Sequence, residues 1–292
     1  MQQSVVLSIG LPIALVIIML GLGLSVRLED FLRCLSRPWP LLVGLLCHIV
    51  ILPLLCLALV WLADLPPAIS VGMMLLAASP GGTSAAIYTH LARGDLALSL
   101  MLAAVTSVLS LFTLPLFINF SMVVFYGEAS AVRLELRQVL QIFVIAIVPA
   151  MIGALIRGRF PDLAERLDRP VKTMATVFLV GLVLAALVGQ RGLLLEWGPT
   201  VGAVALAFAI CSLLVGYLVP RMLRVERRQA VAVSMSMGIH NAALVIALAM
   251  SEHMLANPEM AIPPAAYGVI AYIVAGIFVW ILNRQKAAAA AA

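Results

Sequence analysis

The sequence predicts an all-α, multi-pass membrane protein with nine transmembrane helices. Of its 292 residues, 64% are hydrophobic and only 11% are charged, whereas about 25% are charged in ordinary soluble domains. A helix needs roughly 20 apolar residues to cross the hydrocarbon layer, and nine stretches of about that length follow one another along the chain. This composition excludes a water-soluble enzyme, gives no sign of a nucleic-acid-binding tail, and makes the lipid bilayer the expected surroundings.

The predicted spans belong to one transmembrane domain, residues 1–292. They cover approximately residues 4–26, 39–63, 67–92, 96–125, 136–156, 171–190, 197–219, 229–250 and 262–282. The first is interpreted as a retained helix rather than a signal peptide, because Arg27 follows its apolar run and no positive charge precedes it. The four cysteines have no CxxC spacing and are interpreted as packing residues, so neither a disulfide nor a metal site is expected.

The basic residues predict the orientation of these spans. Fifteen of the 18 Lys and Arg residues fall on one side of the arrangement, and only Arg133, Arg137 and Arg191 fall on the other. Cytoplasmic loops of membrane proteins carry the excess of Lys and Arg. We therefore expect a cell-membrane protein with its N-terminus outside and its C-terminus in the cytoplasm.

Two of the spans carry signals of a broken helix. Residues 67–92 contain SPGGTS at 79–84, in which Pro80, Gly81 and Gly82 remove or weaken backbone hydrogen bonds that lipid cannot replace. Residues 229–250 carry a weaker signal, Gly238 close to His240 and Asn241. Paired interruptions of this kind are typical of an inverted-repeat transporter with two discontinuous crossing helices.

The charge pattern at mid-membrane favours an anionic substrate. All 13 acidic residues lie in predicted loops or at span ends, whereas cation pumps and antiporters usually depend on a carboxylate inside the membrane. The free N–H groups and positive dipole ends of the second half-helices attract anions. A small organic anion, most simply a carboxylate, is therefore the expected substrate.

Three segments carry a family resemblance. The stretches MLLAASPGGT (74–83), LARGDLALS (91–99) and MGIHN (237–241) resemble the bile acid:sodium symporter family over nearly the whole chain. The resemblance implies transport by rocking between two groups of helices. The panel would hold spans 4–26, 136–156 and 171–190, and the core the other six.

The resemblance also implies a site at the two interruptions. Its candidate substrate-binding residues are Gly82, Thr83, Ser84, His240 and Asn241. The positions that hold one sodium ion in the family are occupied here by Ala85, Ala86, Ser99, Ala103 and Ser236, of which only Ser99 and Ser236 keep a side-chain oxygen. The two Gln positions of the second ion are occupied by His48 and His240. Imidazole nitrogen is a poor ligand for a hard cation, so these changes argue against sodium coupling, and no other cofactor is expected.

The coupling mechanism has three alternatives at this point. His48 and His240 are the only ionisable residues deep in the predicted membrane region, and such residues are usually functional. The first alternative is a proton that enters with the anion through one of these histidines, the second is uncoupled passage, and the third is sodium coupling as in the family. A different class of protein, a non-transporting membrane sensor or scaffold that kept the fold, also fits the loss of the sodium ligands.

An enzyme is not expected from the sequence. No nucleophile, acid and base converge, and Ser79 lacks the Gly-x-Ser-x-Gly surroundings of a nucleophile elbow. The sequence indicates neither the identity of the substrate nor an oligomeric state.

Overall fold

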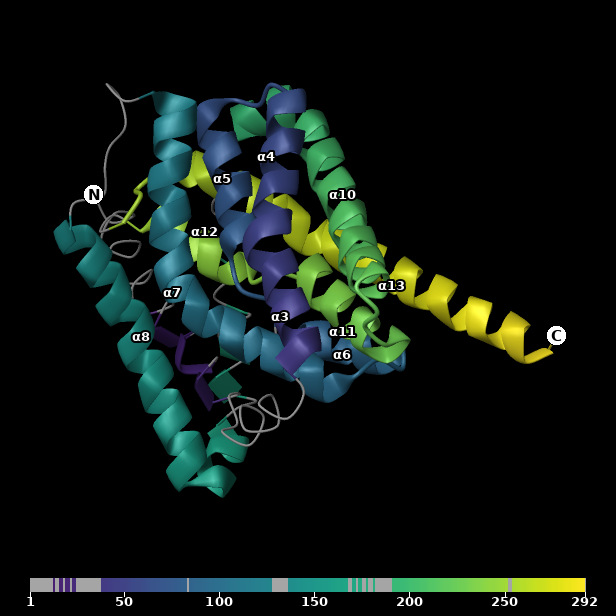
Figure 1. Ribbon diagram of the computed structural model, residues 1–292. Helices are drawn as coiled ribbons and strands as arrows, with labels where there is room; N and C mark the ends of the chain where they lie inside the picture. Colours follow the sequence, from purple (N-terminus) through teal and green to yellow (C-terminus); the bar gives the residue numbers. More distant parts are fainter. Residues whose placement is uncertain are drawn as a thin grey trace.

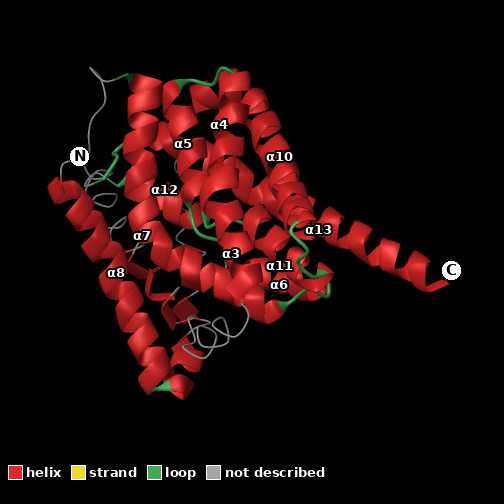
Figure 2. Cartoon of the chain, viewed as in Figure 1, coloured by secondary structure: helices red, strands yellow, loops and turns green. Residues whose placement is uncertain are grey.

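The computed structural model describes residues 38–82, 84–127, 136–167, 191–251 and 254–291, and isolated positions within 13–24 and 170–181. In these ranges the regular elements are helices gathered into a bundle, with α8 along one side (Figure 1). Figure 2 shows how helices account for nearly all of the part that is coloured. The predicted spans 4–26 and 171–190 lie largely outside the described residues. The count of nine spans and the panel and core division therefore stay predictions.

The described helices follow the predicted spans closely. The first of these spans consists of α3 (Pro38–Leu46), the π-helix η1 (Cys47–Ile51) and α4 (Leu52–Leu62), and it is followed by α5 (Pro67–Ala78), α6 (Ser84–Leu91), α7 (Leu96–Tyr126) and α8 (Leu136–Arg159). The second half has α10 (Arg191–Met222), α11 (Arg227–Gly238), α12 (Ala242–Met250), the 3₁₀ helix η2 (Pro258–Ala261) and α13 (Ile262–Ala291). By length and composition, three described helices can cross a membrane, and a fourth can if the bent α7 counts as one span.

Both interruptions are places where a helix stops inside the bundle. Helix α5 ends at Ala78, and Ser79 is extended with ψ 152°, as the residue before a proline prefers. Helix α11 ends at Gly238, and Ile239 is extended with φ −124° and ψ 102°. The two extended pieces pair with each other, because the Gly82 N–H donates to the Ile239 carbonyl (2.7 Å) and the Asn241 N–H donates to the Pro80 carbonyl (3.0 Å). Protein thus supplies hydrogen bonds that lipid could not.

The surroundings of the two broken helices repeat each other. Asp64 (φ 47°) and Arg224 (φ 61°) take the left-handed conformation in the turns that precede α5 and α11. Arg93 (φ 56°) and Ala256 (φ 47°) take it after α6 and α12. This repetition supports the inverted repeat that the sequence predicts.

Two helices beside the interruptions are irregular, and prolines explain both. In η1 the Leu52 N–H donates to the Cys47 carbonyl, a spacing of five residues, and Pro53 follows without an N–H of its own. Helix α7 bends by 58° between its parts Leu96–Ser110 and Phe112–Tyr126. Pro115 lies four residues after Leu111, so it gives Leu111 no hydrogen bond and its ring crowds that carbonyl. Neither irregularity was predicted.

The core lies around α5 and α11. All residues from Ala68 to Ala78 and from Gln229 to Gly238 are buried, and α7, α10 and α13 pack against these two helices. Burial of both broken helices inside the bundle holds their interruptions in one place, where the candidate site forms.

Candidate functional site

The candidate site lies where the two interruptions cross. Gly81 and His240 form an isolated antiparallel bridge, and α6 and α12 begin just beyond it, at Ser84 and Ala242. The first N–H groups of a helix have no partner within the helix and carry a partial positive charge. Two such ends therefore start from the same bridge.

Asn241 caps one of these helix ends. Its Oδ1 accepts a hydrogen bond from the Leu244 N–H of α12 (3.1 Å), as Asn at an N-cap commonly does. Its Nδ2 has no hydrogen-bond partner among the described residues and is available to an acceptor. The cap therefore fixes a donor group at the mouth of α12.

The other predicted substrate residues are distributed around this point. Gly82 is bonded to Ile239 of the opposite interruption, so the structure brings Gly82, His240 and Asn241 together. Ser84 has its hydroxyl 3.3 Å from the Tyr272 hydroxyl of α13. Thr83 lies outside the described residues.

His48 and His240 meet at one carbonyl group. His48 Nε2 lies 2.9 Å, and His240 Nδ1 lies 3.4 Å, from the oxygen of Ser79, and the ring centroids are 5.4 Å apart. A carbonyl oxygen only accepts, so each of these nitrogens carries the proton and donates it. The opposite nitrogens, His48 Nδ1 and His240 Nε2, are buried without a partner in the described part of the chain. Each can accept one hydrogen bond or one proton.

An aromatic enclosure holds the His240 ring. Phe208 of α10 stacks on it at 5.9 Å between centroids with an interplanar angle of 15°, and Tyr267 of α13 lies 5.7 Å away. The Tyr267 hydroxyl donates to the Gly238 carbonyl at 2.8 Å. The sequence analysis did not predict either residue, although a tyrosine inside the predicted span 262–282 could have indicated a polar contact within the bundle.

Two positions that resemble the family's sodium ligands, Ser99 and Ser236, keep a hydroxyl group, and the two hydroxyls have different surroundings. The Ser99 hydroxyl lies 3.1 Å from the Thr89 hydroxyl. The Ser236 hydroxyl is buried and has no partner among the described residues. A β-carbon built on Gly81 would lie 2.7 Å from this oxygen, so Ser236 lies directly against the first interruption. Thr106 of α7 also contacts the first interruption, because its hydroxyl accepts a hydrogen bond from the Gly81 N–H at 3.3 Å.

Comparison with known proteins identifies the family of the chain. Residues 12–197 match the sodium bile acid symporter family, which is more than half of the chain. The chain belongs to this family. The family resemblance read from its motifs is therefore confirmed.

Relatives of this sodium bile acid symporter family member come from bacteria, plants and animals. The chain is 27% identical to the "Uncharacterized sodium-dependent transporter YocS" of Bacillus subtilis, over 89% of this chain and 78% of the relative. It is 30% identical to the "Probable sodium/metabolite cotransporter BASS1, chloroplastic" of Arabidopsis thaliana, over 94% of this chain and 66% of the relative. It is 28% identical to the "Ileal sodium/bile acid cotransporter" of Homo sapiens, over 82% of this chain and 69% of the relative.

These similarities change the order of the sequence-based alternatives. The relatives of this family member are membrane transporters and not enzymes, as the sequence predicted. All three descriptions name sodium. They favour sodium coupling, which the sequence placed behind a proton-coupled or uncoupled mechanism because of the altered sodium positions.

Proposed function

We propose that this protein is a sodium-coupled secondary transporter of a small organic anion, most simply a carboxylate, and works by alternating access. The observation that carries the proposal is the bridge between the two interruptions, from which two helix N-termini and the Asn241 amide start together. A site built from such donors favours negative charge. The relatives' names support the sodium. Residues 4–26, 136–156 and 171–190 are proposed as the panel, with the N-terminus outside the cell membrane.

Hydroxyl oxygens beside the first interruption support an ion site. Sodium is a hard cation that prefers oxygen ligands. Ser236 has a buried hydroxyl with no partner in the described chain, and the lone pairs of such a group are available to a cation. Backbone carbonyls at the helix ends would complete the set, as in other transporters with interrupted helices. We therefore propose Ser236 as a sodium ligand, and we propose Ser99 as a second one only because of its position in the family resemblance, since its hydroxyl contacts Thr89.

The first experiment measures the melting temperature of the purified protein in detergent with a panel of small carboxylates, each in sodium and in potassium, at pH 5.5 and 7.5. A ligand that binds only the folded state raises this temperature by mass action. We expect one carboxylate to stabilise the protein more in sodium than in potassium. Equal stabilisation in both salts would contradict sodium coupling, and no stabilisation by any carboxylate would favour a sensor or scaffold.

In the same assay, Ser236→Ala is expected to raise the sodium concentration for half-maximal stabilisation at least threefold. Ser121→Ala is the matched control, because Ser121 is another buried hydroxyl without a partner among the described residues and lies on α7, away from the crossing. If both variants need the same sodium concentration as the unchanged protein, Ser236 is not a ligand.

A second candidate function, proton-coupled transport, has its own observation. The unpartnered nitrogens of His48 and His240 lie inside the bundle, where a buried group without a hydrogen bond is costly and needs an explanation. A bound anion beside them would stabilise a protonated ring. This candidate uses the same anion site and differs only in the coupling ion.

Replacement of both His48 and His240 by Gln is expected to remove any acceleration of uptake by an inward proton gradient in proteoliposomes, because amide groups do not titrate. Sodium-driven uptake should remain measurable. His90→Gln is the control, because His90 is exposed near the end of α6. If the double variant still accumulates substrate under a proton gradient alone, these two histidines are not the proton carriers.

A further inference from the structure

Tyr267 carries a polar group into an apolar part of the bundle. Its side chain is 1% exposed, and it lies in α13, which is long and apolar enough to cross a membrane. A buried hydroxyl without a hydrogen bond costs free energy. Tyr267 avoids this cost, because its hydroxyl donates to the Gly238 carbonyl at 2.8 Å. Phenylalanine would fill nearly the same space, so the hydrogen bond is what distinguishes tyrosine at this position.

The Gly238 carbonyl lies at the point where α11 stops. In a continuous helix this carbonyl would accept the N–H of residue 242, but residue 242 begins α12 beyond the extended piece. The last carbonyls of a helix need partners from elsewhere. Through Tyr267, α13 supplies a partner that the interrupted helix cannot supply.

Helix α10 also holds the last turn of α11. A β-carbon on Gly238 would overlap the Leu213 side chain, so the two helices pack closely here. The Ser234 hydroxyl donates to the Leu213 carbonyl at 2.7 Å. The end of α11 is therefore fixed by close packing against α10 and by the Tyr267 hydrogen bond from α13.

The Tyr267 ring extends this contact to the residue before Asn241. Its centroid lies 5.7 Å from that of the His240 ring and 5.5 Å from that of Phe208, which stacks on His240. Tyr267 thus contacts the chain at Gly238 and at His240. Asn241 follows directly, so a shift of either contact moves the amide that is the proposed donor to the anion.

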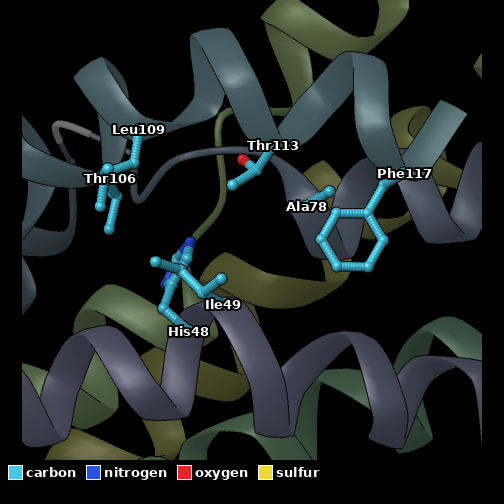
Figure 3. A pocket seen from close by; sticks show the side chains of 7 residues that line it. All are labelled: His48, Ile49, Ala78, Thr106, Leu109, Thr113 and Phe117. Carbon is cyan, nitrogen blue, oxygen red and sulfur yellow. The ribbon is translucent and has the colours of Figure 1, made fainter.

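The first interruption has a comparable contact from η1. His48 Nε2 donates to the Ser79 carbonyl at 2.9 Å, directly after the end of α5. A small cavity beside this contact is lined by residues that all belong to η1, α5 and α7 (Figure 3). A change at Tyr267 in α13 therefore leaves the lining of this cavity and the His48 contact in place.

We propose that Tyr267 is a positioning residue for the substrate anion. Its hydroxyl holds the end of α11, its ring holds His240, and these two contacts together fix the direction of the Asn241 amide. This role rests on the proposed function, because it acts through the anion site. The Asn241 N–H keeps its own hydrogen bond to the Pro80 carbonyl, so loss of the Tyr267 hydroxyl should weaken anion binding without destroying the site.

The test uses Tyr267→Phe, which removes the hydroxyl and keeps the ring. The first readout is the carbonyl carbon of Gly238 in the full-length protein in lipid nanodiscs, with ¹³C at the glycine carbonyls and ¹⁵N in isoleucine. The sequence has only two Gly–Ile pairs, 238–239 and 276–277. Gly276→Ala identifies the second pair, because its β-carbon would meet no atom within 4 Å. We expect the Gly238 signal to shift upfield in Tyr267→Phe, because the carbonyl loses a hydrogen bond.

The second readout is anion binding, measured as the carboxylate concentration for a half-maximal rise of the melting temperature in sodium. Acetate, pyruvate, succinate and benzoate serve as probes. We expect Tyr267→Phe to need at least fivefold more of the most effective probe than the unchanged protein. Ser70→Ala is the matched control, because it also removes a buried hydroxyl that donates to a carbonyl, that of Leu65 at 2.9 Å, near the start of α5. It should lower the melting temperature without ligand and leave the carboxylate concentration unchanged.

The outcomes separate the hydrogen bond from its role. An unchanged Gly238 signal in Tyr267→Phe would overturn the hydrogen bond. A shifted signal with an unchanged carboxylate concentration would overturn the positioning role. The same rise in carboxylate concentration in Ser70→Ala would also overturn it, because the rise would then follow from lower stability alone. If no probe stabilises the unchanged protein, the proposed function fails and the positioning role with it, whereas the Gly238 signal still decides whether Tyr267 holds the end of α11.

Discussion

Asn241→Asp is expected to reduce uptake of the anion at least tenfold while the protein stays folded. Aspartate is as good an N-cap as asparagine, so the hydrogen bond from the Leu244 N–H is kept. The donor Nδ2 is replaced by a negative oxygen at the mouth of α12, which repels an anion. The measurement is initial uptake in proteoliposomes together with the melting temperature of each variant.

The control for this substitution is Asn257→Asp. Asn257 makes the same kind of cap, because its Oδ1 accepts the Glu259 N–H in front of η2, but it lies outside the two interruptions. We expect Asn257→Asp to transport at nearly the original rate. Unchanged uptake in Asn241→Asp would show that Asn241 does not meet an anion, and faster uptake would indicate a cationic substrate.

Gly81→Ala is expected to lower uptake at least tenfold. A β-carbon at this position would lie 2.7 Å from the Ser236 hydroxyl oxygen and 3.2 Å from the Ser236 carbonyl oxygen. The two interruptions must then separate, which strains the bridge that holds the site together. The measurement is uptake, accompanied by the melting temperature, which should fall because overpacking of a buried site costs about 1 to 3 kcal/mol.

Two further variants separate this contact from a general effect of alanine. Gly276→Ala in α13 has no neighbouring atom within 4 Å of the added carbon and should leave uptake nearly unchanged. The double change Gly81→Ala with Ser236→Gly removes the nearest contact and should recover part of the lost stability. Gly81→Ala with the original melting temperature and uptake would mean that the interruptions need no close approach.

The two helix breaks could be expected from the sequence to different degrees. Pro80 followed by two glycines removes a donor and weakens the helix, so an interruption after residue 78 follows from local chemistry. Gly238 alone gave a weak signal. Helix α11 ends there because Ile239 and Asn241 pair with the first interruption, a long-range contact that no local pattern reveals.

The arrangement around His48 was harder to predict. The family resemblance puts His48 and His240 at ligand positions of the same ion, which implies that they lie close together, whereas their separation in the chain says nothing about distance. The π-turn depends on how Pro53 is accommodated, and a proline can equally kink a helix. Pro115 lies within the predicted span 96–125, so the sequence could have predicted a bend in α7. The direction of that bend, which leaves space beside His48, depends on packing.

The bridge between the interruptions also sets an order of events during synthesis. The Pro80 carbonyl accepts from the Asn241 N–H, and the Gly82 N–H donates to the Ile239 carbonyl. Residues 239 and 241 leave the ribosome much later than the first half. At 5 to 20 residues per second, that delay is roughly 8 to 30 s. Throughout this interval the first half has polar backbone groups at membrane depth without their final partners, so it must be held near water, the insertion machinery or a chaperone until the second half arrives.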